Sequence, residues 1–487
     1  MGFTTLDYLV VAVYLVGVAL FGILRGGKNQ TARDYFLGKG DIPWWVVCFS
    51  IVAAETSTLT FISIPGLAYL TNLNFLQVTI GYLLGRIAIS ALFLPAYFKG
   101  ELSTAYAFLE TRFGAKTRRF ASVTFLFTRL AADGVRLFAT AIPLKLVMDI
   151  EYPLAIIILA GVAFVYTFAG GVRGVIWVDA VQMVVYLGGA MLAGIVLVSG
   201  AEGGWSGLTA LAAEAGKFQI FNFDFSEGFF QRPYSILAGI LGGAFLSMAS
   251  HGTDQLIVQR VLATKSLAAS RKALIGSGII IIVQFAIFLT VGLLLYGYYN
   301  GASIAELGVT RADEIFPKFI IEGLPPGVSG IIIAGLLAAA LSTLAGSMSS
   351  LASSTVLDLY KPLSGANLSE EQELRLSRRV TLMWAVLLVG SAIFFMETSQ
   401  TVVELALSIA SFTYGGLLGT FLLGVLVKRT TQEDALAGFV GGIFIMIIVI
   451  SLKLAAWTWF TMIGVTTTLM IGGLLSMLSK KSASTPS

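Results

Sequence analysis

The chain has 487 residues, of which 57% are hydrophobic and only 12% are charged, and its formal net charge is +4. A water-soluble protein of this length cannot bury so much apolar surface, because soluble domains carry about 25% charged residues. The single cysteine and single histidine exclude a disulfide framework and a zinc cluster. The composition therefore predicts a protein that lies in a lipid bilayer.

About 13 apolar runs follow one another along the chain, most of them close to the length of about 20 residues that spans a bilayer. In chain order they cover residues 4–24, 43–70, 75–98, 119–144, 153–170, 175–199, 232–258, 273–298, 327–357, 380–396, 401–427, 434–452 and 455–478. The polar stretches between them are too short for a soluble domain. This pattern predicts an all-α polytopic membrane protein without a catalytic module, hence not an enzyme.

Basic residues alternate between the connecting segments. With the N-terminus outside, 22 Lys and Arg fall in the cytoplasmic segments and 6 fall outside. Cytoplasmic loops of membrane proteins carry an excess of Lys and Arg. The alternation predicts a multi-pass protein of the plasma or inner membrane, with an outside N-terminus and a cytoplasmic C-terminus.

Two of the runs have polar centres. Residues 50–61 of the second run are rich in Ser and Thr and include Glu55, and Pro65 and Gly66 follow. The seventh run is interrupted at residues 247–255. The two runs are five apart, which is the spacing expected for two five-helix halves of inverted topology whose broken helices bind ligands near the midplane. For either patch alone, a polar seam between helices is the alternative.

The ninth run is rich in small residues between Ala338 and Ser350. Small side chains allow helices to approach closely. The hydroxyls of Ser342 and Thr343 also offer neutral oxygen ligands to a monovalent cation. For residues 347–350 we favour close packing.

Three stretches, residues 170–182, 252–263 and 339–343, make the chain similar to the sodium:solute symporter family, which includes sodium–glucose, sialic acid, proline and monocarboxylate transporters. The resemblance runs from about residue 5 to 430. It implies an inverted five-helix repeat like that of the leucine transporter. The expected parts are an extra N-terminal helix (1–30), the first repeat (43–200), the second, inverted repeat (228–428), two C-terminal helices (432–478) and a cytoplasmic tail (479–487).

The resemblance also implies a sodium site. Carbonyls of the first broken helix and carbonyl and hydroxyl groups of the ninth run would bind Na⁺, and the matching positions are Ala53, Thr56, Ala339, Ser342 and Thr343. A proton carried by Asp179 or Glu55 is the alternative coupling ion, but the Ser–Thr pair favours sodium.

Some members bind a second sodium through additional serines and the aspartate that matches Asp179. Here Ala345 and Gly346 lack the hydroxyls, which predicts one sodium per substrate. Asp179 would then be an ion relay towards the cytoplasmic exit, or pair with a basic residue at a helix end.

The resemblance places the substrate beside the ion, where the expected contacts are Glu55, Ser57, Thr60, Phe75, Gln77, Thr79, Arg136 and His251. Thr60 replaces the glutamine of sugar transporters, and Ala132 stands where sialic acid transporters have an arginine. Arg136 lies one helical turn from that position, on one face with Arg129 and Asp133. Arg129 and Asp133 are expected to pair. For His251, lining the cavity or capping the break is the simpler interpretation.

Together these features predict a sodium-coupled symporter that imports a small carboxylate or zwitterion, such as a sugar acid or amino acid, by alternating access. A sodium/sugar symporter is the alternative. An ion channel or a membrane-bound sensor is disfavoured, because no filter-like segment or soluble module is visible. The expected partners are the substrate, sodium and the lipid bilayer, with no nucleic acid and with a monomer as the functional unit.

Overall fold

The structure, a computed structural model, describes residues 3–27, 31–38, 40–100, 102–148, 150–226, 228–365, 367–397 and 402–478. Over these ranges the chain forms helices and connecting segments, and its only β-type pairing is a single bridge between Ile42 and Thr264. The predicted all-α fold is confirmed. The expected tail at 479–487 lies outside the described residues.

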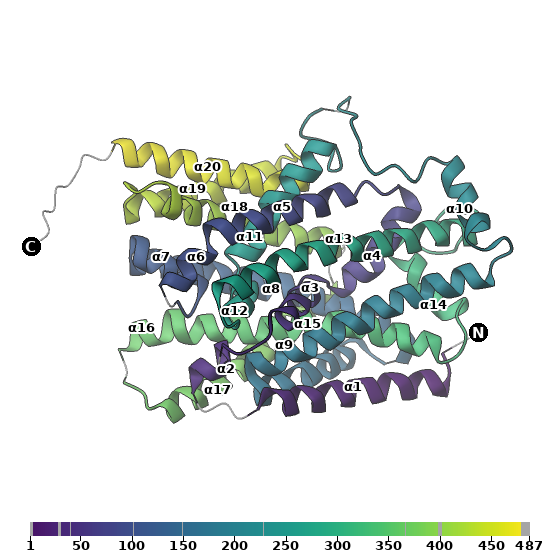
Figure 1. The fold of residues 1–487 in the computed structure, drawn as a ribbon, viewed down its shortest axis with the longest axis horizontal. Helices are drawn as coiled ribbons and strands as arrows, with labels where there is room; N and C mark the ends of the chain where they lie inside the picture. Colours follow the sequence, from purple (N-terminus) through teal and green to yellow (C-terminus); the bar gives the residue numbers. More distant parts are fainter. Residues whose placement is uncertain are drawn as a thin grey trace, which may run out of the picture.

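The long helices run along the long axis of the molecule (Figure 1). Within the described ranges, eight are long and apolar enough to cross a membrane, and one bent pair adds a ninth candidate. The long helices are α1 (Thr5–Gly26), α5 (Leu76–Leu92), α8 (Ala115–Met148), α9 (Tyr152–Gly200), α13 (Leu267–Tyr298), α15 (Val328–Ser354), α17 (Glu370–Phe394), α18 (Val402–Leu426), α19 (Gln432–Ser451) and α20 (Trp457–Leu478).

Shorter helices complete the bundle and its connections. They are α2 (Ala32–Leu37), α3 (Trp44–Glu55), α4 (Thr58–Leu70), α6 (Leu94–Lys99), α7 (Ala105–Phe113), α10 (Gly204–Glu214), η1 (Ala238–Gly242), α11 (Gly243–Gly252), α12 (Gln255–Leu262), η2 (Ala312–Glu314), α14 (Ile315–Glu322), η3 (Thr355–Tyr360), α16 (Lys361–Ser364) and η4 (Phe395–Glu397). Each predicted apolar run falls on these helices, with α9 covering two runs in its 49 residues.

The second predicted run is broken where its sequence is most polar. α3 and α4 meet at an angle of 68°, because Thr56 and Ser57 leave the helical conformation. The Ser57 hydroxyl accepts the Thr60 N–H at 3.4 Å and so caps the N-terminus of α4. Serine is a preferred N-cap residue. Polar residues at 56 and 57 therefore end one helix and start the next.

The seventh run breaks in the same way between α11 and α12. Thr253 and Asp254 leave the helix, and the Asp254 carboxylate accepts the Leu256 N–H at 2.9 Å at the start of α12. Both breaks expected from the sequence are thus present.

Three glycines, Gly26 on α1 and Gly170 and Gly171 on α9, let α1 lie directly against α9. Gly171 kinks α9 with a φ of +57°, which glycine adopts without steric cost. A Cβ on Gly26 would lie only 2.1 Å from the Gly170 Cα. The close contact of α1 with the kink therefore requires glycine.

α15 lies at the centre of the bundle and is buried along nearly its whole length. It packs against α9, α1 and α8. The Asp7 carboxylate of α1 accepts the N–H groups of Gly327 and Gly330, both at 2.8 Å, at the start of α15. A carboxylate at this position satisfies free N–H groups and interacts favourably with the helix dipole.

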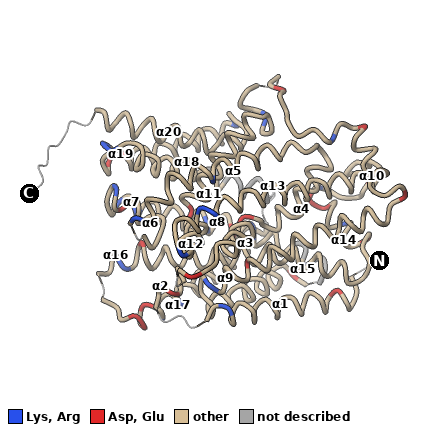
Figure 2. The backbone as a smooth tube through the Cα atoms, in the orientation of Figure 1, with Lys and Arg blue, Asp and Glu red and all other residues tan. Residues whose placement is uncertain are grey.

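Several Lys and Arg residues lie at the end of the bundle that holds α7, α16 and α19 (Figure 2). α20 ends at the same side, and α1 begins at the opposite side (Figure 1). The core helices between the two ends carry few charges, and those few mark the site described next.

Candidate functional site

The break between α3 and α4 faces the middle of α15. The Thr343 hydroxyl of α15 lies 3.5 Å from the Ala54 carbonyl. The Thr56 N–H still bonds within α3, to Val52 O at 3.1 Å, and the chain then leaves the helix. The carbonyls from Ala53 onward therefore have no partner inside α3, and they provide neutral oxygen atoms beside the hydroxyls of α15.

The structure brings the five expected sodium ligands into two neighbouring segments, and all five are buried: Ala53, Thr56, Ala339, Ser342 and Thr343. The Thr343 hydroxyl donates to the Ala339 carbonyl at 3.2 Å. The Thr56 hydroxyl accepts from the Gln284 amide at 2.8 Å, so Thr56 would bind an ion through its carbonyl. Hard neutral oxygens of this kind suit a small monovalent cation such as Na⁺.

Asp179 is fully buried on α9 and contacts Ser342, one of the expected sodium ligands. Its carboxylate accepts from the hydroxyls of Ser342 at 2.7 Å and Ser50 at 2.6 Å. It also pairs with Arg260, in the last turn of α12, at 2.8 Å. A Cβ on Gly346 would lie 2.5 Å from this guanidinium. The expected pairing of Asp179 with a basic residue is present, and its role as an ion relay stays a prediction.

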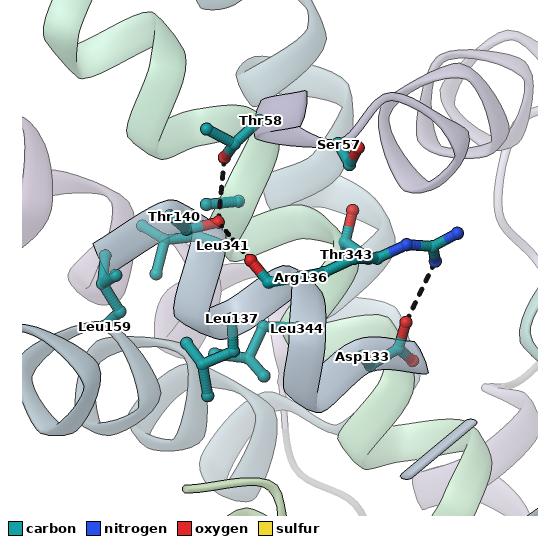
Figure 3. A pocket seen from close by; sticks show the side chains of 11 residues that line it. Ser57, Thr58, Asp133, Arg136, Leu137, Thr140, Leu159, Leu341, Thr343 and Leu344 are labelled. Atoms are coloured by element: carbon teal, nitrogen blue, oxygen red, sulfur yellow. Dashed lines mark hydrogen bonds and ion pairs between the residues drawn. The ribbon is translucent and has the colours of Figure 1, made fainter. Parts of the chain in front are cut away.

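A small cavity of about 10 Å³, roughly enough for one water molecule, lies beside the break (Figure 3). Ser57 and Thr58 line it from α4 and its start, Thr343 from α15, and Arg136 from α8. The Arg136 side chain is 25% exposed, and its guanidinium pairs with Asp133, one turn earlier on α8 (Figure 3). The cavity therefore places a cationic group beside the predicted ion ligands.

Arg136 belongs to a larger charge network. Asp133 accepts from Arg136 at 3.0 Å and from Arg129 at 3.3 Å, so the expected pairing of Arg129 with Asp133 is present. Arg129 also pairs with Asp254 at 2.7 Å, and the Tyr414 hydroxyl donates to Asp254 at 2.8 Å. Buried charges are stable only when paired and hydrogen-bonded in this way.

Glu55, the last residue of α3, has a different partner from the one considered in the sequence. It forms an ion pair with Arg86 of α5, rather than lying against Arg136. His251 Nε2 lies 3.4 Å from the same carboxylate. The Arg86 side chain is fully buried and that of Glu55 is 19% exposed, so Glu55 presents a neutralised carboxylate at the break.

The remaining expected substrate residues divide into two groups. Ser57 lines the cavity, and the Thr60 hydroxyl lies 3.4 Å from that of Ser57. Gln77 and Thr79 are fully buried on α5, and the Gln77 amide bonds main-chain groups outside the cavity at Asn74, Tyr234 and Asn222.

Phe75 precedes α5 and stacks on Phe285, with ring centroids 5.0 Å apart. Substrate contact by Phe75, Gln77 and Thr79 stays a prediction.

The sequence interpretation missed Arg86 as the partner of Glu55 and Asp254 as the partner of Arg129. Arg86 had a signal, because an arginine inside an apolar run needs a partner within the membrane. Asp254 had a weaker signal, since an aspartate at a helix start reads as an N-cap. The partners lie 31 and 125 residues apart in the chain, so local patterns could not connect them.

The sequence model of the sodium:solute symporter family matches residues 35–442. A sodium/sialic acid symporter of Aliivibrio fischeri is 30% identical over 98% of this chain and 94% of its own length. One of Proteus mirabilis is 29% identical over 90% and 88%, and a human sodium-coupled monocarboxylate transporter is 28% identical over 91% and 71%.

A solved structure of a sodium-coupled sialic acid symporter, in a substrate-bound outward-open state, superposes with a TM-score of 0.90. It is 26% identical and covers 98% of both chains. A nucleobase–cation symporter structure matches with a TM-score of 0.54 at 13% identity, covering 91% of this chain and 94% of its own, and supports the fold alone.

Proposed function

The chain belongs to the sodium:solute symporter family, and we propose that this sodium-coupled symporter imports a small carboxylate, such as a sugar acid or an amino acid, together with one sodium ion. Its family and relatives are transporters, so it is a multi-pass membrane transporter and not an enzyme. The observation that carries the proposal is the helix break at Thr56, which faces Ser342 and Thr343 beside a cavity lined by Arg136.

Sodium is proposed to bind between the break and α15, at the carbonyls of Ala53, Thr56 and Ala339 and the hydroxyls of Ser342 and Thr343. The hydrogen bond between Ser342 and Asp179 supports this assignment. Because the Ser342 hydroxyl donates its proton to the Asp179 carboxylate, the lone pairs of the Ser342 oxygen remain free to bind a cation.

One sodium per substrate is supported by the surroundings of Asp179. Ala345 and Gly346 provide no hydroxyl on the next turn of α15. The carboxylate is also neutralised by Arg260, which removes the excess negative charge that would favour a second cation.

A carboxylate substrate is supported by Arg136. Its guanidinium is the partly exposed basic group of the cavity, and guanidinium groups bind carboxylates through paired hydrogen bonds. Glu55 is neutralised by Arg86, so it suits a hydroxyl donor better than a free ammonium. This combination favours a hydroxylated carboxylate over an amino acid, and the sialic acid relatives act on a substrate of that kind.

A sodium/sugar symporter is the second candidate, because the Glu55 carboxylate and the Ser57 hydroxyl offer acceptors to a neutral polyol without using Arg136. The wider proposal places the N-terminus outside and the C-terminus in the cytoplasm of the plasma or inner membrane. We also propose that the two inverted repeats span residues 43–200 and 228–428, between the N-terminal helix and the two C-terminal helices. The proposed functional unit is a monomer.

A thermal-shift screen of the purified protein tests the proposal. Sugar acids, other carboxylates, amino acids and hexoses are compared in sodium and in potassium. We expect a sugar acid to stabilise the protein in sodium only, and Arg136→Gln to abolish that shift while the melting temperature without ligand stays similar. Stabilisation by a hexose, unchanged in Arg136→Gln, would replace the carboxylate proposal with the sugar alternative.

A further inference from the structure

The connection between α10 and η1 exposes an unusual number of aromatic side chains. Within residues 218–226 and 228–230, called the phenylalanine loop below, six phenylalanines are at least 40% exposed, and Phe223 at the tip reaches 67%; they are Phe218, Phe221, Phe223, Phe225, Phe229 and Phe230. Exposed apolar patches of this density mark surfaces that contact a partner or a membrane.

The loop is held in one conformation at its base. The buried side chain of Gln77 accepts the Asn222 N–H at 3.1 Å and donates to the Tyr234 carbonyl at 3.0 Å. The Ile236 N–H closes the loop by donating to the Asn222 carbonyl at 2.8 Å. The exposed phenylalanines therefore sit on an anchored segment.

The polar side chains of the loop form their hydrogen bonds and ion pair with nearby residues of the same connection. Residues 221–225 alternate between phenylalanine and a polar residue, so in an extended chain they point to opposite sides. Asp224 pairs with Arg232 at 2.5 Å, and the Asn222 side chain accepts the Asp224 N–H at 3.0 Å. The phenylalanines are left as the outward face.

The loop continues the apolar surface of the membrane-spanning helices. Phe229 and Phe230 pack on Trp459 in the first turn of α20, with ring centroids 5.1 and 5.3 Å apart. Leu237 and Leu241, which follow the loop, are 40% and 42% exposed. The loop lies beside the start of α20, at the periphery of the bundle (Figure 1). Aromatic side chains are enriched where membrane-spanning segments meet the lipid headgroups.

We infer that the phenylalanine loop inserts its aromatic face into the interfacial region of the adjacent lipid leaflet. The partner is the boundary between headgroups and acyl chains, where aromatic side chains are favoured and where neutralised polar groups can remain hydrated. The loop thereby fixes the connection between the two predicted repeats to the membrane surface. The inference holds whichever solute the protein carries.

Fluorescence quenching in proteoliposomes tests this insertion. Phe223→Cys is labelled with an environment-sensitive nitrobenzoxadiazole probe; the native thiol at Cys48 is buried, and unsubstituted protein treated alike corrects for any label there. Ala305→Cys, at an exposed position in the connection between α13 and η2, is the matched control. The vesicles are phosphatidylcholine with a nitroxide on the headgroup, near the top of the acyl chain or near its end, and iodide reports exposure to water.

We expect headgroup and upper-chain nitroxides to quench the probe at 223 several-fold more than the probe at 305, and iodide to show the reverse order. Equal iodide quenching at both positions would overturn the inference, because Phe223 would then face water. Protection of position 223 from both iodide and nitroxides would also overturn it, since another protein surface, such as a second copy of the chain, would then cover the loop.

Discussion

The two broken helices share a sequence character but are built in different ways. The break between α3 and α4 is lined by neutral carbonyls and hydroxyls that are only partly engaged, next to the hydroxyls of α15. The break between α11 and α12 is fixed by Asp254, which bonds Arg129 and Tyr414. Among the described residues, the non-helical Thr56 and Ser57 have no charged partner, although Glu55 before them pairs with Arg86. The non-helical Asp254, in contrast, pairs with Arg129. We therefore expect the first interruption to be available for a ligand and the second to hold a helix in place.

The largest effect is expected at the charged break. Asp254→Ala leaves Arg129 with only the longer contact to Asp133 in a buried site, and breaking such a pair costs about 3 kcal/mol or more. We expect much of the protein to be lost during purification or to melt far lower. Fluorescence-detected size-exclusion profiles at increasing temperature give the measurement. Thr56→Ala is the matched control at the neutral break, and similar melting of the two variants would remove the contrast.

A smaller effect is expected for Glu55→Gln, which keeps the shape of the side chain and removes its charge. Glu55 is partly exposed beside His251, so the loss should weaken binding of the solute identified in the screen by at least about tenfold, or about 1.4 kcal/mol. Sodium binding measured alone should change less. Separate titrations of the purified variant decide this, and a variant normal in both titrations would make Glu55 only the structural partner of Arg86.

For the ion site we expect Ser342→Ala and Thr343→Ala each to raise the half-saturating sodium concentration by about tenfold, or 1.4 kcal/mol. Each hydroxyl is one of about five weak neutral ligands, so its loss should leave the fold intact. Uptake into proteoliposomes over a range of sodium concentrations gives the value. Ser350→Ala, which removes a buried hydroxyl lower on the same helix, is the control. Unchanged sodium dependence in both test variants would place the ion elsewhere.

The smallest change is expected in the coupling ratio. Thr343→Ala should weaken sodium binding without altering the ratio of one sodium per solute, because Arg260 continues to neutralise Asp179. Reversal potentials of transport at set sodium gradients report the ratio. A two-ion ratio in the unsubstituted protein would contradict the single-site proposal.

The sequence predicted the helices and both breaks because these depend on local patterns: apolar runs set the spans, and Ser57 and Asp254 set the helix starts. Polar and small residues marked the two segments of the proposed ion site, and the family resemblance implied that they share it. The charge partners could not be predicted in this way. Arg86 and Arg260 reach Glu55 and Asp179 only after distant helices have packed, and no periodicity connects them.

The contact of Asp7 with the start of α15 bears on how the protein is made. α1 leaves the ribosome well before α15, because the N–H groups that the Asp7 carboxylate binds belong to residues 320 and 323 positions later. At a synthesis rate of 5–20 residues per second, roughly 15 to 60 seconds separate the two events. Of its described contacts, the Asp7 carboxylate has only those with Thr4 during that interval, so synthesis of the first turn of α15, rather than insertion of α1, sets the earliest moment at which this contact can form.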